Sequence, residues 1–393
     1  MDQIHDMLAK SRLYNPNNQE ALNQFKTLFK FLAFVASAAK IPIGSNLFEE
    51  TKKVVEKIGT AENIYTWSWT PQQLKIISSS ESMKKVALCG GNGTGKTMIL
   101  KEMAKARAQE GKRVVYIIFT CNGIKTLLYF QLKSEFKNTS IEIGLYDYFA
   151  DSEKFIDLEN AYIFIDEAVG LKNLEGLIMN NYFDKCSSVC MALGLKPEES
   201  KGLLSEFHII SLELSLRTTQ KVTNLVKNEP KYFPQRLGNS MNESLKILPH
   251  MPLGKDVVTI RRTAGEPLIQ VMKRAMDNVT PATKLLICLN DDFSLKKSEE
   301  ILSCFYMAMQ NRPLIFMHSK YNFENSKEED IEKWVDNHPS MKGRALVADS
   351  TTVPGFEAEV VMGIGEFDTT DRNINIFISR ARVQFIRVLV VSS

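Results

Sequence analysis

The sequence predicts an α/β protein in which two units, each built on a parallel β-sheet, follow a helical N-terminal segment. From about residue 62, short apolar runs alternate with helical stretches, which is typical of a parallel sheet flanked by helices. A glycine-rich loop follows the first run, and two carboxylates end the third. With 393 residues, 44% of them apolar, the chain is long enough for two or three domains.

The N-terminal segment, residues 1–60, is expected to be helical. Residues 21–39 are rich in Leu, Phe and Ala, and residues 47–58 place apolar side chains on one side of a helix. Prolines at positions 16 and 42 lie in the turns that separate these stretches. Such helices can cover a cleft, bind a partner protein or join further domains, and the sequence does not choose among these roles.

The remaining chain is expected to form a first unit over residues 61–206 and a second over residues 207–393. In the first unit the predicted strands are 86–89, 114–119 and 162–165. In the second unit the predicted strands are 208–214, 257–260, 285–289, 314–317, 345–347, 360–364 and 386–391, with helices at 266–277, 294–310 and 374–383.

Composition and charge favour an intracellular protein, cytoplasmic or nuclear, with no membrane contact. Residues 31–39, the longest uncharged stretch near the N-terminus, are far too short to span a bilayer, and nothing at Met1 resembles a secretory signal. Six scattered cysteines suit a reducing compartment. Two of them, Cys186 and Cys190, are spaced to share a helix face, where core packing is expected rather than zinc binding.

The net charge of +3 does not indicate a nucleic-acid-binding protein, but its distribution is uneven. Residues 84–137 contain eleven Lys or Arg residues against three Glu, a local excess of eight positive charges because 11 − 3 = 8. This excess has two interpretations. It is either a solvated helix face or a track for a phosphate backbone beside a nucleotide site.

The loop after the first apolar run has the pattern G-x-x-x-x-G-K-T, which is typical of phosphate binding. Glycines allow backbone N–H groups to turn toward a polyphosphate, a path that side chains would obstruct. Lys96 is expected to reach the β- and γ-phosphates, and Thr97 to place its hydroxyl on Mg²⁺. A plain strand-to-helix turn is the alternative. The residues predicted to hold the phosphates are Gly90, Gly91, Asn92, Gly93, Thr94, Gly95, Lys96 and Thr97.

The third apolar run ends in Asp166 and Glu167, some seventy residues after Lys96. Beside a phosphate loop, an acid at a strand end holds Mg²⁺, directly or through water, and the next acid can polarise the attacking water. We therefore assign Asp166 to the metal and Glu167 to the role of general base. The alternative is a helix N-terminus with favourable dipole charges.

Upstream of the loop, Thr70 and Pro71 are expected to begin a helix as N-cap and first helical residue. Gln73 follows, and this Thr-Pro-x-Gln start resembles the adenine-reading Q motif of superfamily 1 helicases. The resemblance implies that the Gln73 amide reads the adenine of ATP, because an amide can donate to N7 and accept from N6 at once.

Downstream segments resemble further motifs of that superfamily, in the expected order. Residues 115–122 resemble motif Ia, which implies that Phe119, Thr120 and Asn122 contact a single strand; core packing is the alternative for Phe119. Residues 212–219 resemble motif IV, in which Arg217 would reach the γ-phosphate.

Residues 353–361 resemble motif V and imply nucleotide contacts for Gly355 and Glu357. The sequence Ile378-Ser379-Arg380-Ala381-Arg382 resembles motif VI, in which Arg380 is the second arginine finger.

The resemblance covers roughly residues 65–393, and within the superfamily the second unit looks most like the helicase-like domain of Schlafen proteins and related minimal members. The sequence departs from the motif pattern of the superfamily in two places. Motif III, a strand ending G-D-x-x-Q, is not visible between Leu171 and His208, which puts the coupling of hydrolysis to movement in doubt. Pro354 also stands where motif V commonly has Lys.

The resemblance implies two RecA-like units of the P-loop NTPase type, with ATP and Mg²⁺ in the cleft between them. The first hypothesis is an ATPase that binds single-stranded DNA or RNA and translocates along it or remodels it, without assumed duplex unwinding. The second is a nucleotide-switched interaction or signalling module that moves no nucleic acid.

Overall fold

The computed structural model describes residues 70–79, 84–120, 125–147, 158–168, 182–194, 204–215, 218–228, 245–247, 254–277, 279–280, 283–290, 293–309, 313–317, 326–365, 376–378 and 380–390. The chain divides into two compact units, Met1–Lys75 with Leu248–His250, and Ile76–Ile247 with Met251–Ser393. Both sheets belong to the second unit. The predicted helices of residues 1–60 lie outside the described residues.

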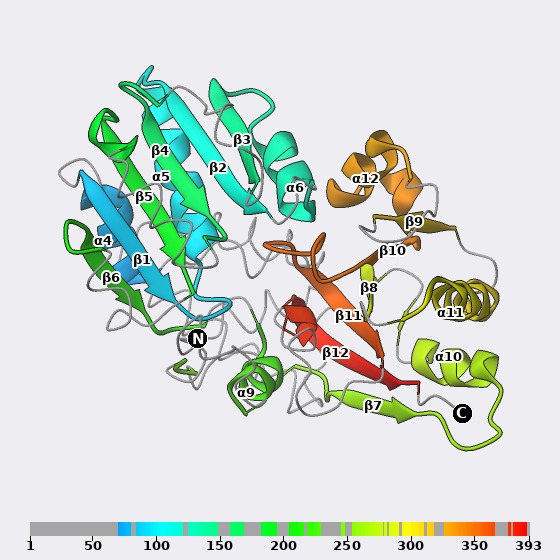
Figure 1. Ribbon diagram of the computed structural model, residues 1–393. Helices are drawn as coiled ribbons and strands as arrows, with labels where there is room; N and C mark the ends of the chain where they lie inside the picture. Colours follow the sequence, from blue (N-terminus) through cyan, green and yellow to red (C-terminus); the bar gives the residue numbers. More distant parts are fainter. Residues whose placement is uncertain are drawn as a thin grey trace, which may run out of the picture. The chain divides into compact units, whose positions relative to one another are not determined.

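The first sheet has six parallel strands in the order β3-β2-β4-β5-β1-β6 (Figure 1). Parallel neighbours place the carboxyl ends of their strands at one edge, so the residues after β1 and β4 meet there. The strands are β1 Lys85–Gly90, β2 Val114–Thr120, β3 Ile141–Asp147, β4 Tyr162–Asp166, β5 Ser188–Leu193 and β6 His208–Leu212.

The second sheet also has six parallel strands, in the order β7-β12-β11-β8-β10-β9. Its strands are β7 Val258–Arg261, β8 Leu285–Leu289, β9 Leu314–Phe316, β10 Ala345–Ala348, β11 Ala358–Gly365 and β12 Ala381–Leu389. Together the two sheets confirm the predicted α/β class with two parallel sheets.

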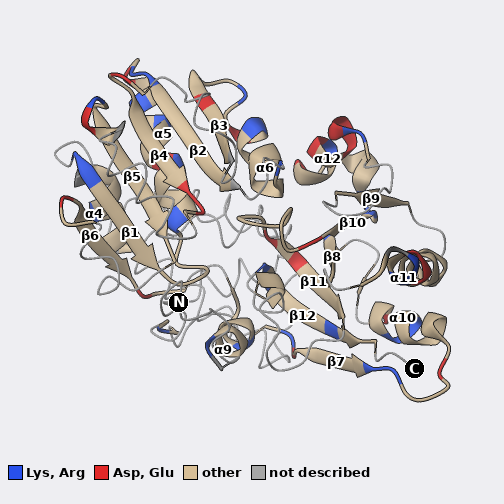
Figure 2. Ribbon diagram, viewed as in Figure 1, with Lys and Arg blue, Asp and Glu red and all other residues tan. Residues whose placement is uncertain are grey.

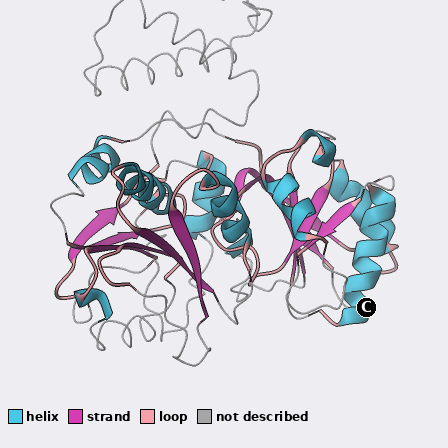
Figure 3. Ribbon diagram, turned by 90° about the horizontal axis from the view of Figure 1, so that it is seen from above, coloured by secondary structure: helices cyan, strands magenta, loops and turns pink. Residues whose placement is uncertain are grey.

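Helices pack alongside the strands of both sheets (Figure 3). Among the described residues they are α4 Pro71–Ser79, α5 Lys96–Gln109, α6 Leu127–Glu135, α9 Gln220–Asn228, α10 Leu268–Met276, α11 Leu295–Ala308 and α12 Glu328–Val335, with the 3-10 turns η2 Tyr182–Asp184 and η4 Pro339–Met341. No helix in this part of the chain is both long and apolar enough to cross a bilayer.

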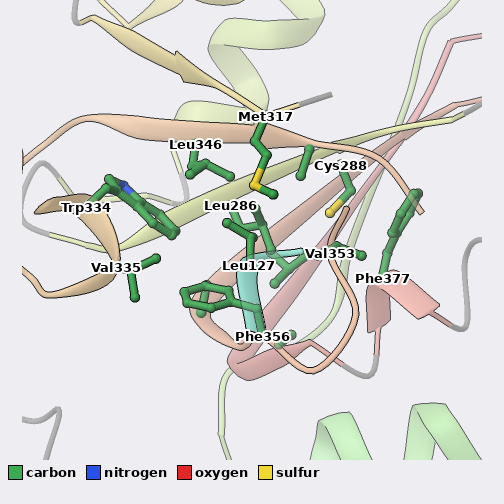
Figure 4. Close-up of a cluster of buried hydrophobic side chains, with 14 of the residues drawn as sticks. Leu127, Leu286, Cys288, Met317, Trp334, Val335, Leu346, Val353, Phe356 and Phe377 are labelled. Carbon is green, nitrogen blue, oxygen red and sulfur yellow. The ribbon is translucent and has the colours of Figure 1, made fainter. Parts of the chain in front are cut away.

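The core of the second sheet is built by alternation along its strands. In β8, Leu286 and Cys288 face one apolar cluster, whereas Leu285, Ile287 and Leu289 face another. The first of these clusters also takes in Leu127 and Phe130 of α6, although α6 lies between two strands of the first sheet in sequence. Figure 4 shows Leu127 among these side chains.

The main departure from the sequence prediction concerns the strand at 208–212. We expected it to open the second set of strands, but β6 pairs with β1 in the first sheet, so that assignment is wrong. The predicted helix at 374–383 is wrong at its end, because β12 starts at Ala381. The unit boundaries 61–206 and 207–393 stay a prediction.

The sequence reading missed strands β3 and β5 and helices α6, α9 and α12. β5 lies between β4 and β1, and Gly194 follows it. The residue after that glycine is Leu195, so the pattern G-D-x-x-Q does not occur at the end of β5. Because β5 contains Cys190, the expectation that Cys186 and Cys190 share a helix face is also wrong.

Candidate nucleotide-binding site

The glycine-rich loop joins β1 to α5, and its backbone requires glycine at several positions. Gly93 and Gly95 have φ angles of 77° and 87°, in the left-handed region that side chains disfavour. A Cβ on Gly90 would lie 2.7 Å from the Thr94 hydroxyl and 2.8 Å from the Leu212 carbonyl oxygen. The tight course of the loop therefore explains the glycines of the motif.

Inside the loop, the Lys96 ammonium donates to the carbonyl oxygens of Gly90 at 2.7 Å and Gly91 at 3.0 Å. The Thr94 hydroxyl donates to the same Gly91 oxygen at 2.9 Å. Helix α5 begins at Lys96, and its N-cap, Gly95, has no side chain to accept from the first N–H groups. A helix start of this kind, with an adjacent ammonium, favours an anion.

The Asp166 carboxylate at the end of β4 is buried and accepts from three donors. Oδ1 accepts from the Thr97 hydroxyl at 3.2 Å and from the Glu167 N–H at 2.9 Å. Oδ2 accepts from the Tyr116 hydroxyl at 2.8 Å. Burial and the charge of Asp166 raise the pKa of Tyr116 well above its usual value, and burial and the same charge raise the pKa of the Cys190 thiol. Asp166 and Thr97, both predicted metal ligands, are therefore brought together.

Glu167 has a φ angle of 52°, an unusual conformation for a residue with a side chain. Strained backbone of this kind concentrates at functional sites. A carboxylate oxygen of Glu167 lies 3.8 Å from Nη1 of Arg380, which directly precedes β12 of the second sheet. The Nε of Arg380 is buried, and no described residue accepts a hydrogen bond from it. Two predicted site residues more than 200 positions apart thus meet.

The segments that resemble motifs V and VI are hydrogen-bonded to each other. The Arg382 guanidinium donates to the Glu357 carboxylate at 3.2 Å, and the Glu357 side chain is 5% exposed. The backbone N–H of Ala358 donates to the Arg380 carbonyl at 3.0 Å. Gly355 has a φ of 71°, and a Cβ there would lie 2.5 Å from Leu128 of α6. These contacts give Gly355 and Glu357 structural roles, and their predicted nucleotide contacts stay a proposal.

The segment that resembles motif IV passes close to the phosphate loop. A Cβ on Gly93 would lie 2.8 Å from the Ser215 hydroxyl, which forms a 3.0 Å hydrogen bond with Thr218. The Thr218 hydroxyl is 2.7 Å from that of Thr223 on α9, and the Thr223 hydroxyl is in turn 3.4 Å from that of Ser215, so three buried hydroxyls form a cluster beside the loop. Arg217 lies outside the described residues.

Gln73 and Thr70 form a reciprocal pair at the start of α4. The Thr70 N–H donates to Gln73 Oε1 at 2.9 Å, and the Gln73 N–H donates to the Thr70 hydroxyl at 3.1 Å. These two bonds form a capping box. Thr70 is therefore the N-cap, as predicted, and the Gln73 oxygen accepts from the Thr70 N–H. Since an amide oxygen can accept two hydrogen bonds, an adenine-reading role for Gln73 is compatible with the capping box and stays a prediction.

Of the three residues predicted to touch a single strand, Phe119 is described most fully. It is 6% exposed in the apolar core of the first sheet, where its ring stacks on that of Tyr146 at 4.7 Å. The alternative interpretation for Phe119, packing in the core, is therefore confirmed. Thr120 is the last residue of β2, and Asn122 lies outside the described residues.

The positive charges of residues 84–137 are largely paired with carboxylates. Some of these pairs lie within the first sheet and its helices, whereas Lys125 and Lys133 near α6 pair with Glu328 and Glu332 of α12 (Figure 2). This pairing weighs against a continuous phosphate track. The paired residues are Lys85, Lys101, Lys105, Arg107, Arg113, Lys125 and Lys133.

The described residues fit a magnesium nucleotide. The loop places an ammonium and uncapped helix N–H groups together, and the Thr97–Asp166 contact joins a hydroxyl to a carboxylate. No group of three or more His, Cys, Asp or Glu in the described part of the chain is arranged to hold a metal ion. The pairing of one hydroxyl with one carboxylate, Thr97 with Asp166, suits Mg²⁺, because Mg²⁺ takes one or two protein ligands together with phosphates and water.

Sequence reasoning missed Tyr116 and the hydroxyl cluster of Ser215, Thr218 and Thr223. The signal for Tyr116 is a phenol within an otherwise apolar strand, since a buried tyrosine hydroxyl usually has a hydrogen-bond partner. The signal for the hydroxyls is their clustering around a helix start, with Ser215 and Thr218 before α9 and Thr223 in its first turn.

No protein-family model matches the sequence, and no curated protein matches it. An arterivirus nonstructural protein 10, a helicase solved with DNA, aligns over 81% of this chain and 63% of its own, at 11% identity and a TM-score of 0.37. The DUF1998 helicase MrfA, solved bound to DNA, aligns over 82% of this chain and 49% of its own, at 10% identity and a TM-score of 0.46. This chain therefore spans less than two thirds of either protein, and likenesses of this size do not identify a family.

Proposed function

We propose that this protein is a helicase-like ATPase whose site takes residues from both sheets. The observation that carries the proposal is the 3.8 Å approach of Arg380, at the start of β12, to Glu167, at the end of β4. A cation beside the acid that follows a phosphate loop and a metal-type aspartate is the arrangement expected for phosphoryl transfer.

In this proposal the loop and α5 bind the nucleotide. Lys96 would leave the carbonyls of Gly90 and Gly91 and donate to phosphate oxygens, while Thr97 and Asp166 would hold Mg²⁺. When bound, Mg²⁺ neutralises charge on the phosphates. Glu167 would accept the proton of the attacking water, and Arg380 would stabilise the negative charge of the transition state.

The finer assignments belong to the same proposal. Membership of superfamily 1, the narrower likeness to Schlafen-type domains, the second finger Arg217, adenine reading by Gln73, and binding of single-stranded DNA or RNA all rest on sequence motifs. A cytoplasmic or nuclear location is proposed from composition and cysteine content. Docking of a protein partner on residues 1–60 is proposed as one of the three roles that the sequence leaves open.

A nucleotide-switched interaction module is the second candidate, and two observations favour it. The basic residues near the loop are largely paired, and no G-D-x-x-Q pattern is visible between Leu171 and His208. In such a module the same contacts would register bound ATP without moving a strand.

Steady-state ATP hydrolysis with and without single-stranded DNA and RNA separates the two candidates. Glu167→Gln keeps the shape of the site and removes the base, so it should retain ATP binding and lose turnover. Stimulation of the wild type by either nucleic acid, absent in Glu167→Gln, supports the helicase-like ATPase. Turnover that ignores both nucleic acids supports the switched module, and failure to bind ATP at all contradicts both.

A further inference from the structure

Tyr116 lies in the middle of β2, two residues before the end of its pairing with β4. In that register Tyr116 is opposite Phe164 and Ile118 is opposite Asp166. Residues paired across parallel strands share a face, and so do residues two apart along a strand. The side chains of Tyr116 and Asp166 therefore lie on one face of the sheet, at neighbouring positions.

Packing fixes where the Tyr116 ring lies. The ring is fully buried, and it contacts the ring of Phe164 at 6.4 Å between centroids and that of Phe136 at 5.6 Å. The hydroxyl at its end donates to Asp166 Oδ2 at 2.8 Å. An ionised carboxylate only accepts, so the phenol is the donor in this pair. The rings thus act as a rigid support for one carboxylate oxygen.

The remaining oxygen of Asp166 faces the loop. Oδ1 accepts from the Thr97 hydroxyl and from the Glu167 N–H, so the Asp166 side chain is held from two directions. Asp166 is 2% exposed, and little water can replace a lost donor there. Removing the Tyr116 hydroxyl would leave a buried oxygen with one partner fewer and would free the carboxylate to turn about its bond to Cβ.

We propose that Tyr116 is a positioning residue, whose hydroxyl holds Asp166 in the orientation that pairs it with Thr97 and thereby sets the affinity of the nucleotide site for Mg²⁺. This inference rests on the proposed nucleotide site. Outer residues that orient metal ligands typically change metal affinity or activity about 10- to 100-fold when they are replaced.

The test measures binding of a fluorescent ADP analogue, first in EDTA and then across a Mg²⁺ series, for wild type and Tyr116→Phe. We expect equal affinity in EDTA within about twofold, and a Mg²⁺ midpoint about tenfold higher in the variant. Tyr162→Phe is the matched control. Like Asp166, Tyr162 lies on β4, but at the opposite end of the strand. The Arg107 guanidinium carbon lies 5.6 Å from the centroid of its ring, a contact that phenylalanine keeps.

A double-variant comparison separates positioning from general damage to the fold. If Tyr116 acts through Asp166, adding Tyr116→Phe to Asp166→Asn should leave the Mg²⁺ midpoint of Asp166→Asn unchanged. A Mg²⁺ midpoint of Tyr116→Phe equal to that of wild type overturns the inference, as does equal weakening in EDTA and in Mg²⁺. A wild type that binds no nucleotide instead overturns the proposed function, and this inference with it.

Discussion

The two sides of the candidate site are built in different ways. On the loop side, most contacts connect neighbours in sequence, such as Lys96 with Gly90 and Gly91, and Thr94 with Gly91. On the far side, Arg380 reaches Glu167 only because the chain between them forms most of a second sheet. The loop side is local and tightly hydrogen-bonded, whereas Arg380 keeps a buried Nε that no described residue satisfies.

This difference indicates that the loop side and the Arg380 side contribute to different steps, binding and turnover. The Lys96 ammonium and the uncapped N–H groups at the start of α5 bring several donors together, which suits the binding of a ligand in one place. A guanidinium with a donor still unused is suited to respond to charge that develops during a reaction. We therefore expect changes on the loop side to affect nucleotide binding, and changes on the far side to affect turnover alone.

The largest loss of binding is expected for Lys96→Ala. It removes the ammonium from the loop, and a hydrogen bond to a charged partner contributes about 1.5 to 3 kcal/mol. ATP affinity, measured by titration calorimetry, should fall about 10- to 100-fold. Lys105→Ala is the control, since Lys105 lies on the same helix and pairs with Glu102. Unchanged ATP affinity in Lys96→Ala would contradict the assignment of the loop.

A smaller loss of binding is expected for Gly93→Ala. The new Cβ would lie 2.8 Å from the Ser215 hydroxyl, at a φ of 77°, so the loop must shift. We expect about tenfold weaker ATP binding, and partial recovery when Ser215→Ala removes the collision. Gly111→Ala is a matched control, because Gly111 has a φ of 73° and open space around its Cβ position.

In Gly111→Ala the backbone strain alone should lower the free energy of unfolding by about 1 to 2 kcal/mol, with ATP affinity unchanged. Denaturant unfolding and calorimetry measure the two quantities. Equal ATP affinities in Gly93→Ala and Gly111→Ala would show that the contact between the loop and Ser215 does not matter for binding.

The smallest effect is expected where α6 meets α12. The Lys133–Glu332 pair, at 2.5 Å, has side chains that are 46% and 32% exposed. Surface ion pairs of this kind contribute about 0.2 to 1 kcal/mol. A double-mutant cycle with alanine at both positions, followed by urea unfolding, should give a coupling within that range. A coupling above about 2 kcal/mol would mean that charge, rather than the burial of Leu127 and Phe130, joins these helices.

The loop side was also the more predictable from sequence. Gly90 to Thr97 and Asp166 are specified by local patterns, and the structure brings Thr97 and Asp166 together as expected. β5 was missed because its six residues form one short apolar run, which periodicity does not distinguish from a buried helix segment. β3 was missed although Ile141, Ile143 and Leu145 alternate with other residues as a strand requires. The sheet to which 208–212 belongs depends on long-range pairing with β1, which periodicity does not report.

The most direct test of the central claim, that Arg380 from the second sheet completes the ATPase site, compares ATP affinity and ATP turnover in wild type and Arg380→Ala. Arg261→Ala, an exposed residue of β7, is the control. We predict nearly equal ATP affinity and a turnover about 10³-fold lower in Arg380→Ala, the magnitude typical of an arginine finger. Equal turnover in Arg380→Ala and wild type, at saturating ATP, would contradict the account.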